Sequence, residues 1–127
     1  MTHSVLYLET GISGHQLNEL IFAVKQAYYD SFSLNSSATS VVIHELESDE
    51  ISDSMHNTVI VLMYTACGKG KEVKKRCAEQ LNNNIRAALG AKAERIEIII
   101  KEQANDMTGE NGIMRANNVF ASSAYEA

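Results

Sequence analysis

The clearest pattern of apolar and polar positions lies between Thr58 and Glu102. A nearly continuous run of apolar and β-branched residues at 58–64 predicts a strand that is buried on both faces. Apolar residues then recur at every fourth position, which predicts an amphipathic helix over 71–89 that ends before Gly90. A second strand is predicted over 95–100. Strand, helix and strand in this order form a βαβ unit, whose two strands are parallel and joined by a right-handed crossover.

The first part of the chain repeats the same order of elements. The pattern predicts a strand over 4–9, a helix over 14–32 and a strand over 40–46. Ser13 is suited to cap the start of this helix, with Gln16 three residues later as its partner in a capping box. We interpret the two halves as an internal βαβ duplication, because the order and lengths of the elements match although the residues do not.

The segment 47–57 joins the two halves and carries four carboxylates, with His44 and His56 close by in the sequence. Such a group of residues would suit a metal site, but the run matches no EF-hand spacing. We therefore favour a solvated loop and predict no metal. After the last strand, the turn-forming cluster 105–112 is predicted to lead into a short strand or hairpin arm over 113–120, and 121–127 is expected to fray.

Two βαβ units in one small domain predict an α+β fold, with a four-stranded mixed sheet and two helices on one face. The single domain spans 1–127, with halves at 4–46 and 58–102 and a C-terminal arm at 103–127. The other face of such a sheet is bare. We expect Val59, Val61, Ile96, Ile98 and Ile100 to supply more apolar surface than one helix layer covers, so the chain should associate with itself through the sheet.

Composition narrows the classes of function. A chain of 127 residues with 45% hydrophobic and 21% charged residues is typical of one soluble globular domain. Its net charge of −5 argues against nucleic acid or an anionic membrane as a partner. The N-terminal residues do not have the pattern of a signal peptide, and two cysteines, Cys67 and Cys77, require no disulfide. We expect a cytoplasmic protein without a cofactor.

Four short stretches share a pattern with a known family. They are the strand 58–64 before a helix that ends Ala87-Ala88-Leu89-Gly90, the strand 96–102 that ends in Glu102, the turn 105–112, and Ile43-His44-Glu45. With the βαβ–βαβ order, these stretches resemble the tautomerase superfamily, which includes macrophage migration inhibitory factor. The likeness is strongest to the malonate semialdehyde decarboxylase-like tautomerases. It implies a homotrimer with its sheets packed inward and a pocket near each N-terminus at a subunit boundary.

The resemblance also implies a catalytic position at Thr2. Enzymes of this superfamily use an N-terminal proline, exposed by loss of the initiator methionine, as a base or acid. Here Thr2 stands in that place and the chain contains no proline. With Met1 removed, Thr2 would offer a primary α-amine, whose reference pKa of about 7.7–8.0 permits proton transfer near neutrality. With Met1 retained, Thr2 is an ordinary strand residue.

The resemblance places the substrate-binding residues at Cys67, Lys69 and Met107. The carboxylate-binding arginines of the decarboxylase-like members fall at Cys67 and Lys69, their late aromatic at Met107, and their acidic partner at Ala38. Lys69 keeps the positive charge, but a lysine cannot form the planar bidentate contact of an arginine. Most of the known catalytic set is therefore replaced in this sequence.

The turn before the second helix suggests a different chemistry. Cys67, Lys69 and Lys71 lie just ahead of the helix N-terminus, where free backbone N–H groups and nearby lysines favour anions and thiolates. We expect either a reactive cysteine or small-anion site here, or a glycine-containing turn with solvated lysines. Cys77 belongs to the apolar stripe of the helix and is predicted to lie in the core.

Two functions are compatible with these observations. The first is an isomerase or decarboxylase acting on a small 2-oxo or enol carboxylate, with Lys69 holding the carboxylate and an α-amine carrying the proton. The second is a non-catalytic trimer that binds a small anion or a protein partner. Without the proline, enol–keto conversion should be slow or absent.

Overall fold

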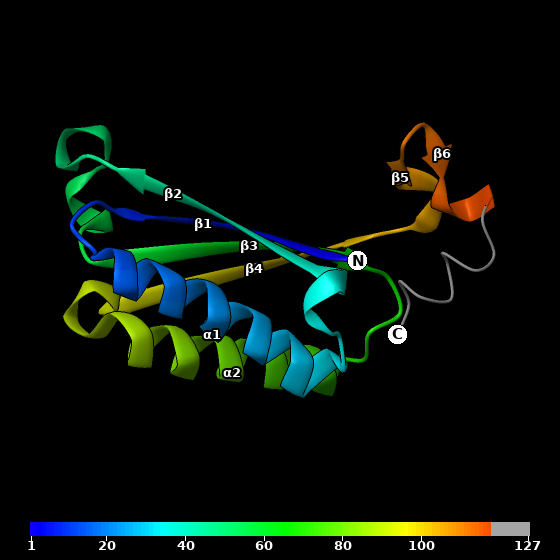
Figure 1. Cartoon of the computed structure of the whole chain (residues 1–127), viewed down its shortest axis with the longest axis horizontal. Coiled ribbons are helices and arrows are strands. Elements are labelled where there is room, and N and C mark those ends of the chain that lie inside the picture. The colour runs from blue at the N-terminus through cyan, green and yellow to red at the C-terminus, as the bar shows by residue number, and fades with distance from the viewer. Residues whose placement is uncertain (118–127) are drawn as a thin grey trace.

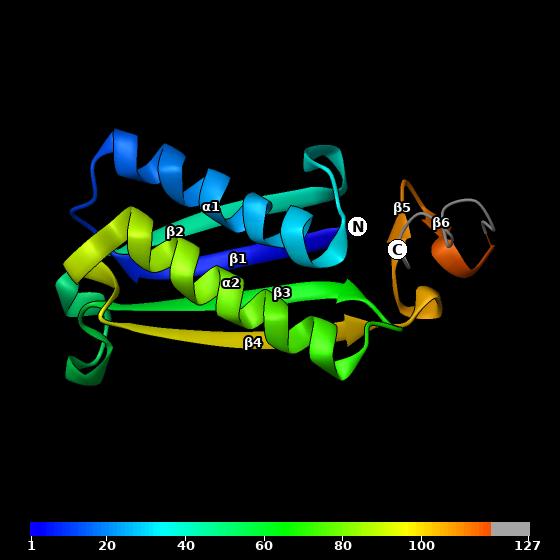
Figure 2. The ribbon, with the colours of Figure 1, turned by 90° about the horizontal axis from the view of Figure 1, so that it is seen from below.

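The computed structural model describes residues 1–117 of the chain. The main elements are β1 (Thr2–Glu9), α1 (Gly14–Phe32), β2 (Thr39–Leu46), β3 (Thr58–Ala66), α2 (Lys71–Leu89) and β4 (Arg95–Gln103). They form one four-stranded sheet in the order β2-β1-β3-β4. The strands within each half are parallel, and β1 and β3 are antiparallel in the middle of the sheet. Both helices cover the same face (Figures 1 and 2), so the predicted α+β architecture with its two βαβ halves is confirmed.

The two helices begin and end where local chemistry favours it. Ser13 accepts a hydrogen bond from the N–H of Gln16 while the Gln16 side chain accepts one from the N–H of Ser13, which is the predicted capping box. Helix α2 ends before Gly90, whose φ of +59° is easily reached only by glycine. The helices are 19 residues each and pack against each other over the sheet. The predicted stripe of α2 forms part of the core, in which these residues are fully or almost fully buried: Cys77, Leu81, Ile85 and Leu89.

The residues on the two faces of the sheet are not those that the sequence pattern predicted. Five residues were expected to supply surplus apolar surface, but all of them lie on the helix-covered face. Val59 and Val61 are buried in the core, and Ile96, Ile98 and Ile100 are partly buried and pack against it. Since side chains alternate along a strand, their neighbours face the other way. The uncovered face therefore carries a different row of residues, which lie side by side across the four strands. We call it the bare-face row: Val42, Val5, Leu62 and Ile99.

The bare-face row is only partly shielded from solvent. Val42 is 49% and Ile99 is 45% exposed. Next to this row, the rings of Tyr7 and His44 stack with their centroids 5.1 Å apart. An apolar strip that crosses a whole sheet, and that no element of residues 1–117 covers, indicates an interaction surface. The reason to expect association through the sheet thus remains, although the residues are different.

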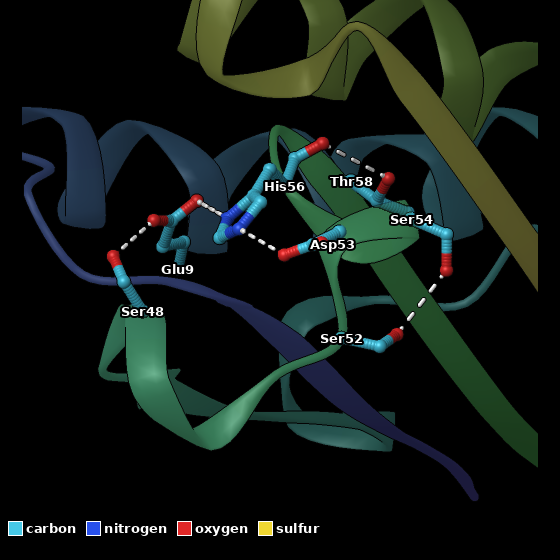
Figure 3. Close-up of polar contacts among 7 residues, drawn as sticks. All are labelled: Glu9, Ser48, Ser52, Asp53, Ser54, His56 and Thr58. Carbon is cyan, nitrogen blue, oxygen red and sulfur yellow. Dashed lines mark hydrogen bonds and ion pairs between the residues drawn. The ribbon is translucent and has the colours of Figure 1, made fainter.

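The linker 47–57 is mostly exposed to solvent and contains short regular turns. It contains two single helical turns, Ser48–Glu50 and Asp53–Met55. Figure 3 shows how the carboxylate of Glu9, at the end of β1, holds it at two points. Ser48 Oγ donates a hydrogen bond of 2.6 Å to one oxygen, and His56 Nδ1 lies 3.2 Å from the other. Among residues 1–117, no group of three histidine, cysteine or acidic side chains could hold a metal ion.

The C-terminal arm begins with a short hairpin. Strands β5 (Gly109–Glu110) and β6 (Ile113–Met114) pair through a turn at Asn111 and Gly112, both with positive φ, as a tight two-residue hairpin turn requires. The predicted arm at 113–120 is described only in its first part, and the predicted fraying at 121–127 lies outside the described residues. Over the described part of the chain, neither helix is long and apolar enough to cross a membrane.

The contact of Glu9 with the linker predicts a pH-dependent contribution to stability. Hydrogen bonds from Ser48, and then from His56, lower the pKa of the Glu9 carboxyl below its usual 4.5. A carboxyl with a lowered folded-state pKa stabilises the fold above its unfolded pKa, and this contribution disappears as pH falls through the folded value. We expect Glu9→Gln to unfold at lower urea concentration than the parent at pH 7, with a difference that shrinks towards pH 3. Glu45→Gln, an exposed change on the neighbouring strand, should show no such trend with pH. Equal losses of stability in the two variants would contradict the assignment of this contribution to Glu9.

Candidate functional site

The antiparallel pairing of β1 and β3 brings three distant parts of the chain to one end of the sheet. His3, near the start of β1, is paired with Tyr64, near the end of β3, and β4 ends beside β3. The hairpin arm lies at this same end, next to the N-terminus (Figures 1 and 2). A hollow of about 40 Å³ is found there. Its lining consists of Met1, His3, Tyr64, Thr65, Ala66, Gln103, Asn105, Thr108 and Arg115.

The α-amine of Met1 is the group at this hollow with the most altered proton affinity. Burial first, and then the positive charges of Arg115 and Lys69, lower its pKa from the ordinary 8.0 to about 5, while Glu110 acts in the opposite direction. An amine with this pKa is neutral at pH 7, so its nitrogen lone pair can accept a proton. Titratable groups with such shifts are concentrated at functional sites.

His3 adds a second titratable group to the hollow. Its Nδ1 lies 2.6 Å from Ser40 Oγ on the adjacent strand, which fixes the orientation of the ring. Burial lowers the pKa of His3, and so do the charges of the α-amine and Arg115. Two neighbouring groups therefore share an environment that disfavours positive charge.

Arg115 reaches the hollow from the C-terminal arm. Its backbone N–H donates a 3.0 Å hydrogen bond to the carbonyl of Thr108, which closes the arm on itself. The side chain is only 11% exposed, and its Nη2 lies 3.7 Å from Glu110 Oε2. A positively charged, largely buried group thus lies next to a neutral amine.

Thr2 itself does not line the hollow. Its side chain is 1% exposed and lies on the helix-covered side of β1, where its hydroxyl forms a 2.8 Å hydrogen bond with that of Thr65. Met1 holds the terminal amine in this structure, so the catalytic assignment of Thr2 stays a prediction about a chain that begins at Thr2.

The turn before α2 is held by a carboxylate of the chain itself. Glu102, at the end of β4, accepts a 3.1 Å hydrogen bond from the N–H of Gly68 and pairs with Lys74. These contacts, with that to Lys74 the strongest, lower the pKa of Glu102. The sequence pattern suggested that backbone N–H groups of this turn could bind an external anion. The N–H of Gly68 instead binds the carboxylate of Glu102. Cys67 lies in the same turn and is exposed.

The three predicted binding residues lie outside the lining of the hollow. Lys69 Nζ donates a 3.4 Å hydrogen bond to the carbonyl of Ala66 and lies 5.0 Å from the centroid of the Phe32 ring. Met107, in a helical turn between β4 and the arm, is 69% exposed. Lys69 acts on the α-amine through its charge, whereas Cys67 and Met107 do not. Their role in binding stays a prediction.

Arg115, Tyr64, Gln103 and His3 were not among the site residues predicted from the sequence. The pairing of β1 with β3 in opposite directions is the signal that would have grouped His3 with Tyr64. Arg115 follows the Asn111-Gly112 turn, and only the course of the hairpin places it beside the N-terminus.

Comparison with protein-family models and with curated protein sequences finds no match. Comparison with solved structures finds close similarity of fold. The crystal structure of native fused 4-OT matches with a TM-score of 0.83 at 18% identity, over 91% of this chain and 98% of that chain. Pt0534 inactivated by 2-oxo-3-pentynoate matches with 0.80 at 15%, over 91% and 96%. FG41 malonate semialdehyde decarboxylase inhibited by 3-bromopropiolate matches with 0.70 at 18%, over 84% and 86%.

These neighbours are tautomerase-superfamily structures, and the likeness extends over most of both chains. The chain therefore has the tautomerase fold, and the predicted resemblance, including that to a malonate semialdehyde decarboxylase, is confirmed at the level of fold. Several of the fused 4-OT structures are trimers, symmetric or asymmetric.

The contrasting positions of the two cysteines predict selective labelling. Cys67 is exposed, whereas Cys77 is buried and burial raises the pKa of its thiol to about 11. The thiolate is the reactive form, so we expect iodoacetamide at pH 7 to modify Cys67 first, as measured by peptide mass spectrometry. Cys77→Ser should leave the labelling rate unchanged and Cys67→Ser should abolish it. Equal labelling of both thiols in folded protein would be incompatible with these positions, and slower labelling with added phosphate would support an anion at the turn.

Proposed function

We propose that this protein moves a proton on a small 2-oxo or enol carboxylate, using the α-amine of its N-terminal residue. The observation that carries the proposal is the neutral amine at the hollow, with a pKa near 5 and cationic side chains around it. The amine supplies a base at pH 7, and the positive charges supply attraction for a carboxylate. The tautomerase fold supports this assignment, because the neighbours include a malonate semialdehyde decarboxylase.

The proposed step is an exchange of one proton without any oxidant or cofactor. The neutral amine takes the proton of the enol oxygen and becomes an ammonium group. The ammonium then returns a proton to the adjacent carbon, C3, while the enol double bond becomes the carbonyl of the 2-oxo acid. The product has the same composition as the substrate and the amine is neutral again. A primary amine lacks the rigid ring of a proline, so the reaction is expected to be slow.

The identity of the N-terminal residue decides how large the site is. Met1 forms part of the lining of a hollow of about 40 Å³, which leaves little room for an acid of three or more carbons. A chain that begins at Thr2 would lack this side chain and would present the Thr2 amine beside it. In both forms the base is a primary α-amine at the start of β1.

The second candidate function is a non-catalytic assembly that binds a small anion or a protein partner. Two observations favour it: the absence of any proline in the sequence and the small volume of the hollow with Met1 present. In this case Lys69 and Arg115 would hold an anion that undergoes no reaction. We place the enzyme first because simple anion binding does not require a neutral amine.

We propose that the assembly is a homotrimer through the bare-face row, with the pocket at a subunit boundary. The uncovered row of Val5, Val42, Leu62 and Ile99 supplies the apolar surface, and fused 4-OT structures with a similar fold are trimers. The proposed location is the cytoplasm, a reducing compartment that would keep the two free cysteines, Cys67 and Cys77, reduced.

A cleavable N-terminal extension tests the role of the amine. We expect the extended chain to convert the enol of phenylpyruvate no faster than buffer, and the protease-released chain to show slow but measurable conversion, after mass spectrometry has identified its first residue. Because the base must be neutral, kcat/KM should be constant near pH 7 and fall about tenfold per pH unit below the amine pKa of about 5. Equal rates before and after release would contradict the proposal, whereas anion binding without turnover would favour the second candidate.

Light scattering tests the assembly. We expect the parent to have about three times the mass of the 14.0 kDa chain at micromolar concentration. Leu62→Glu places a charge in the bare-face row, and burying it unpaired costs several kcal/mol, so this variant should be monomeric. Phe22→Glu, on the outer side of α1 where Phe22 is 67% exposed, is the matched control and should keep the parent mass. A stable monomer of the parent would overturn the proposed interface.

A further inference from the structure

We infer that Arg115, rather than Lys69, is the residue that binds the carboxylate of the substrate. The inference rests on the proposed function and deepens it: it assigns the anchoring group to the C-terminal arm and restricts the substrates to acids whose carboxylate lies next to the reacting carbonyl or enol. Arg115 touches the bound acid but takes no part in the proton transfer, so it is a positioning and specificity-determining residue.

The location of the guanidinium is the first reason. Arg115 lines the same hollow as the Met1 amine, together with the polar side chains of Gln103, Asn105 and Thr108. Its charge acts on the amine more strongly than that of Lys69. In a 2-oxo acid the carboxylate is directly bonded to the reacting C2, so the two binding groups must lie close to each other, as Arg115 and the amine do.

The burial of Arg115 is the second reason. Its side chain is only 11% exposed and lines the hollow that also contains the amine. A charge with little access to water attracts an oppositely charged group more strongly than a solvated charge does. A planar guanidinium also matches a carboxylate in shape, because it can donate two parallel hydrogen bonds to the two oxygens. The ammonium group of Lys69 cannot make such a two-point contact.

The contacts of Lys69 point to another role. Its ammonium group lies between the Ala66 carbonyl and the face of the Phe32 ring, beside the turn before α2. These contacts stabilise the turn and the end of α1. The ammonium group is not part of the lining of the hollow, and moving it there would break both contacts.

Matched variants test the inference: Arg115→Ala, Arg115→Lys, Lys69→Ala, and Arg95→Ala as a control. Arg95 is an exposed arginine at the other end of the sheet, where it pairs with Glu97. Calorimetry would measure binding of phenylpyruvate and of phenylacetone, its neutral analogue without the carboxylate. Circular dichroism and thermal unfolding would establish that each variant is folded.

We expect Arg115→Ala to weaken phenylpyruvate binding by roughly 10–100-fold, the range for a lost hydrogen bond to a charged group, and to leave phenylacetone binding unchanged. Arg115→Lys should recover part of the loss, while Lys69→Ala and Arg95→Ala should stay within about threefold of the parent. In kinetics the loss should appear in KM more than in kcat. Removal of this positive charge should also raise the pKa of the amine, so the acid limb of the pH profile should move to higher pH.

The outcomes separate this inference from the proposed function. Turnover by the parent with an unchanged KM in Arg115→Ala would overturn the inference and leave the function standing. Binding that depends on Arg115 without any turnover would support the inference and overturn the proposed reaction. A larger loss in Lys69→Ala than in Arg115→Ala would assign the carboxylate to Lys69 instead, and equal losses for the acid and the neutral ketone would show that Arg115 acts only on the structure.

Discussion

The antiparallel pairing of β1 with β3 is the contact on which the rest of the structure depends. Each βαβ half has only two parallel strands and one helix, which is too little to bury its own apolar surface. The central pairing joins the halves into one sheet, so that α1 and α2 pack side by side and share one core. Because the two strands run in opposite directions, it also places the start of β1 next to the end of β3. The candidate site exists because of this geometry.

Covering the sheet on one face only has a second consequence. The core takes alternate residues from each strand, including Leu6 and Val61, and their neighbours are left on the other side. The result is an apolar row that crosses all four strands without a layer above it. Among residues 1–117 no further element covers that row, since the hairpin of the arm lies at the end of the sheet (Figure 2). Association between copies of the chain would shield such an apolar surface from water.

The chemistry of the hollow follows from burial and charge more than from the identity of one residue. A proline at the N-terminus is one way to obtain a base near neutral pH, and desolvation of a primary amine next to cations is another. The same surroundings act on His3, whose pKa is lowered for related reasons. A chain without an N-terminal proline can therefore still present a neutral amine at the start of β1.

The sequence by itself determined the elements and their order. The apolar run at 58–64, the four-residue spacing of Cys77, Leu81, Ile85 and Leu89, and the cap at Ser13 are local signals, and each acts within its own segment. The duplicated βαβ pattern was enough to predict the sheet and the side on which the helices lie. Only the tertiary structure decided which alternate residues of each strand face the helices, because a strand with apolar residues on both faces carries no period that distinguishes the two faces. It also decided the site: Met1, His3, Tyr64 and Arg115 are far apart in the chain, and they meet only through strand register and the course of a hairpin, which no local pattern of residues encodes.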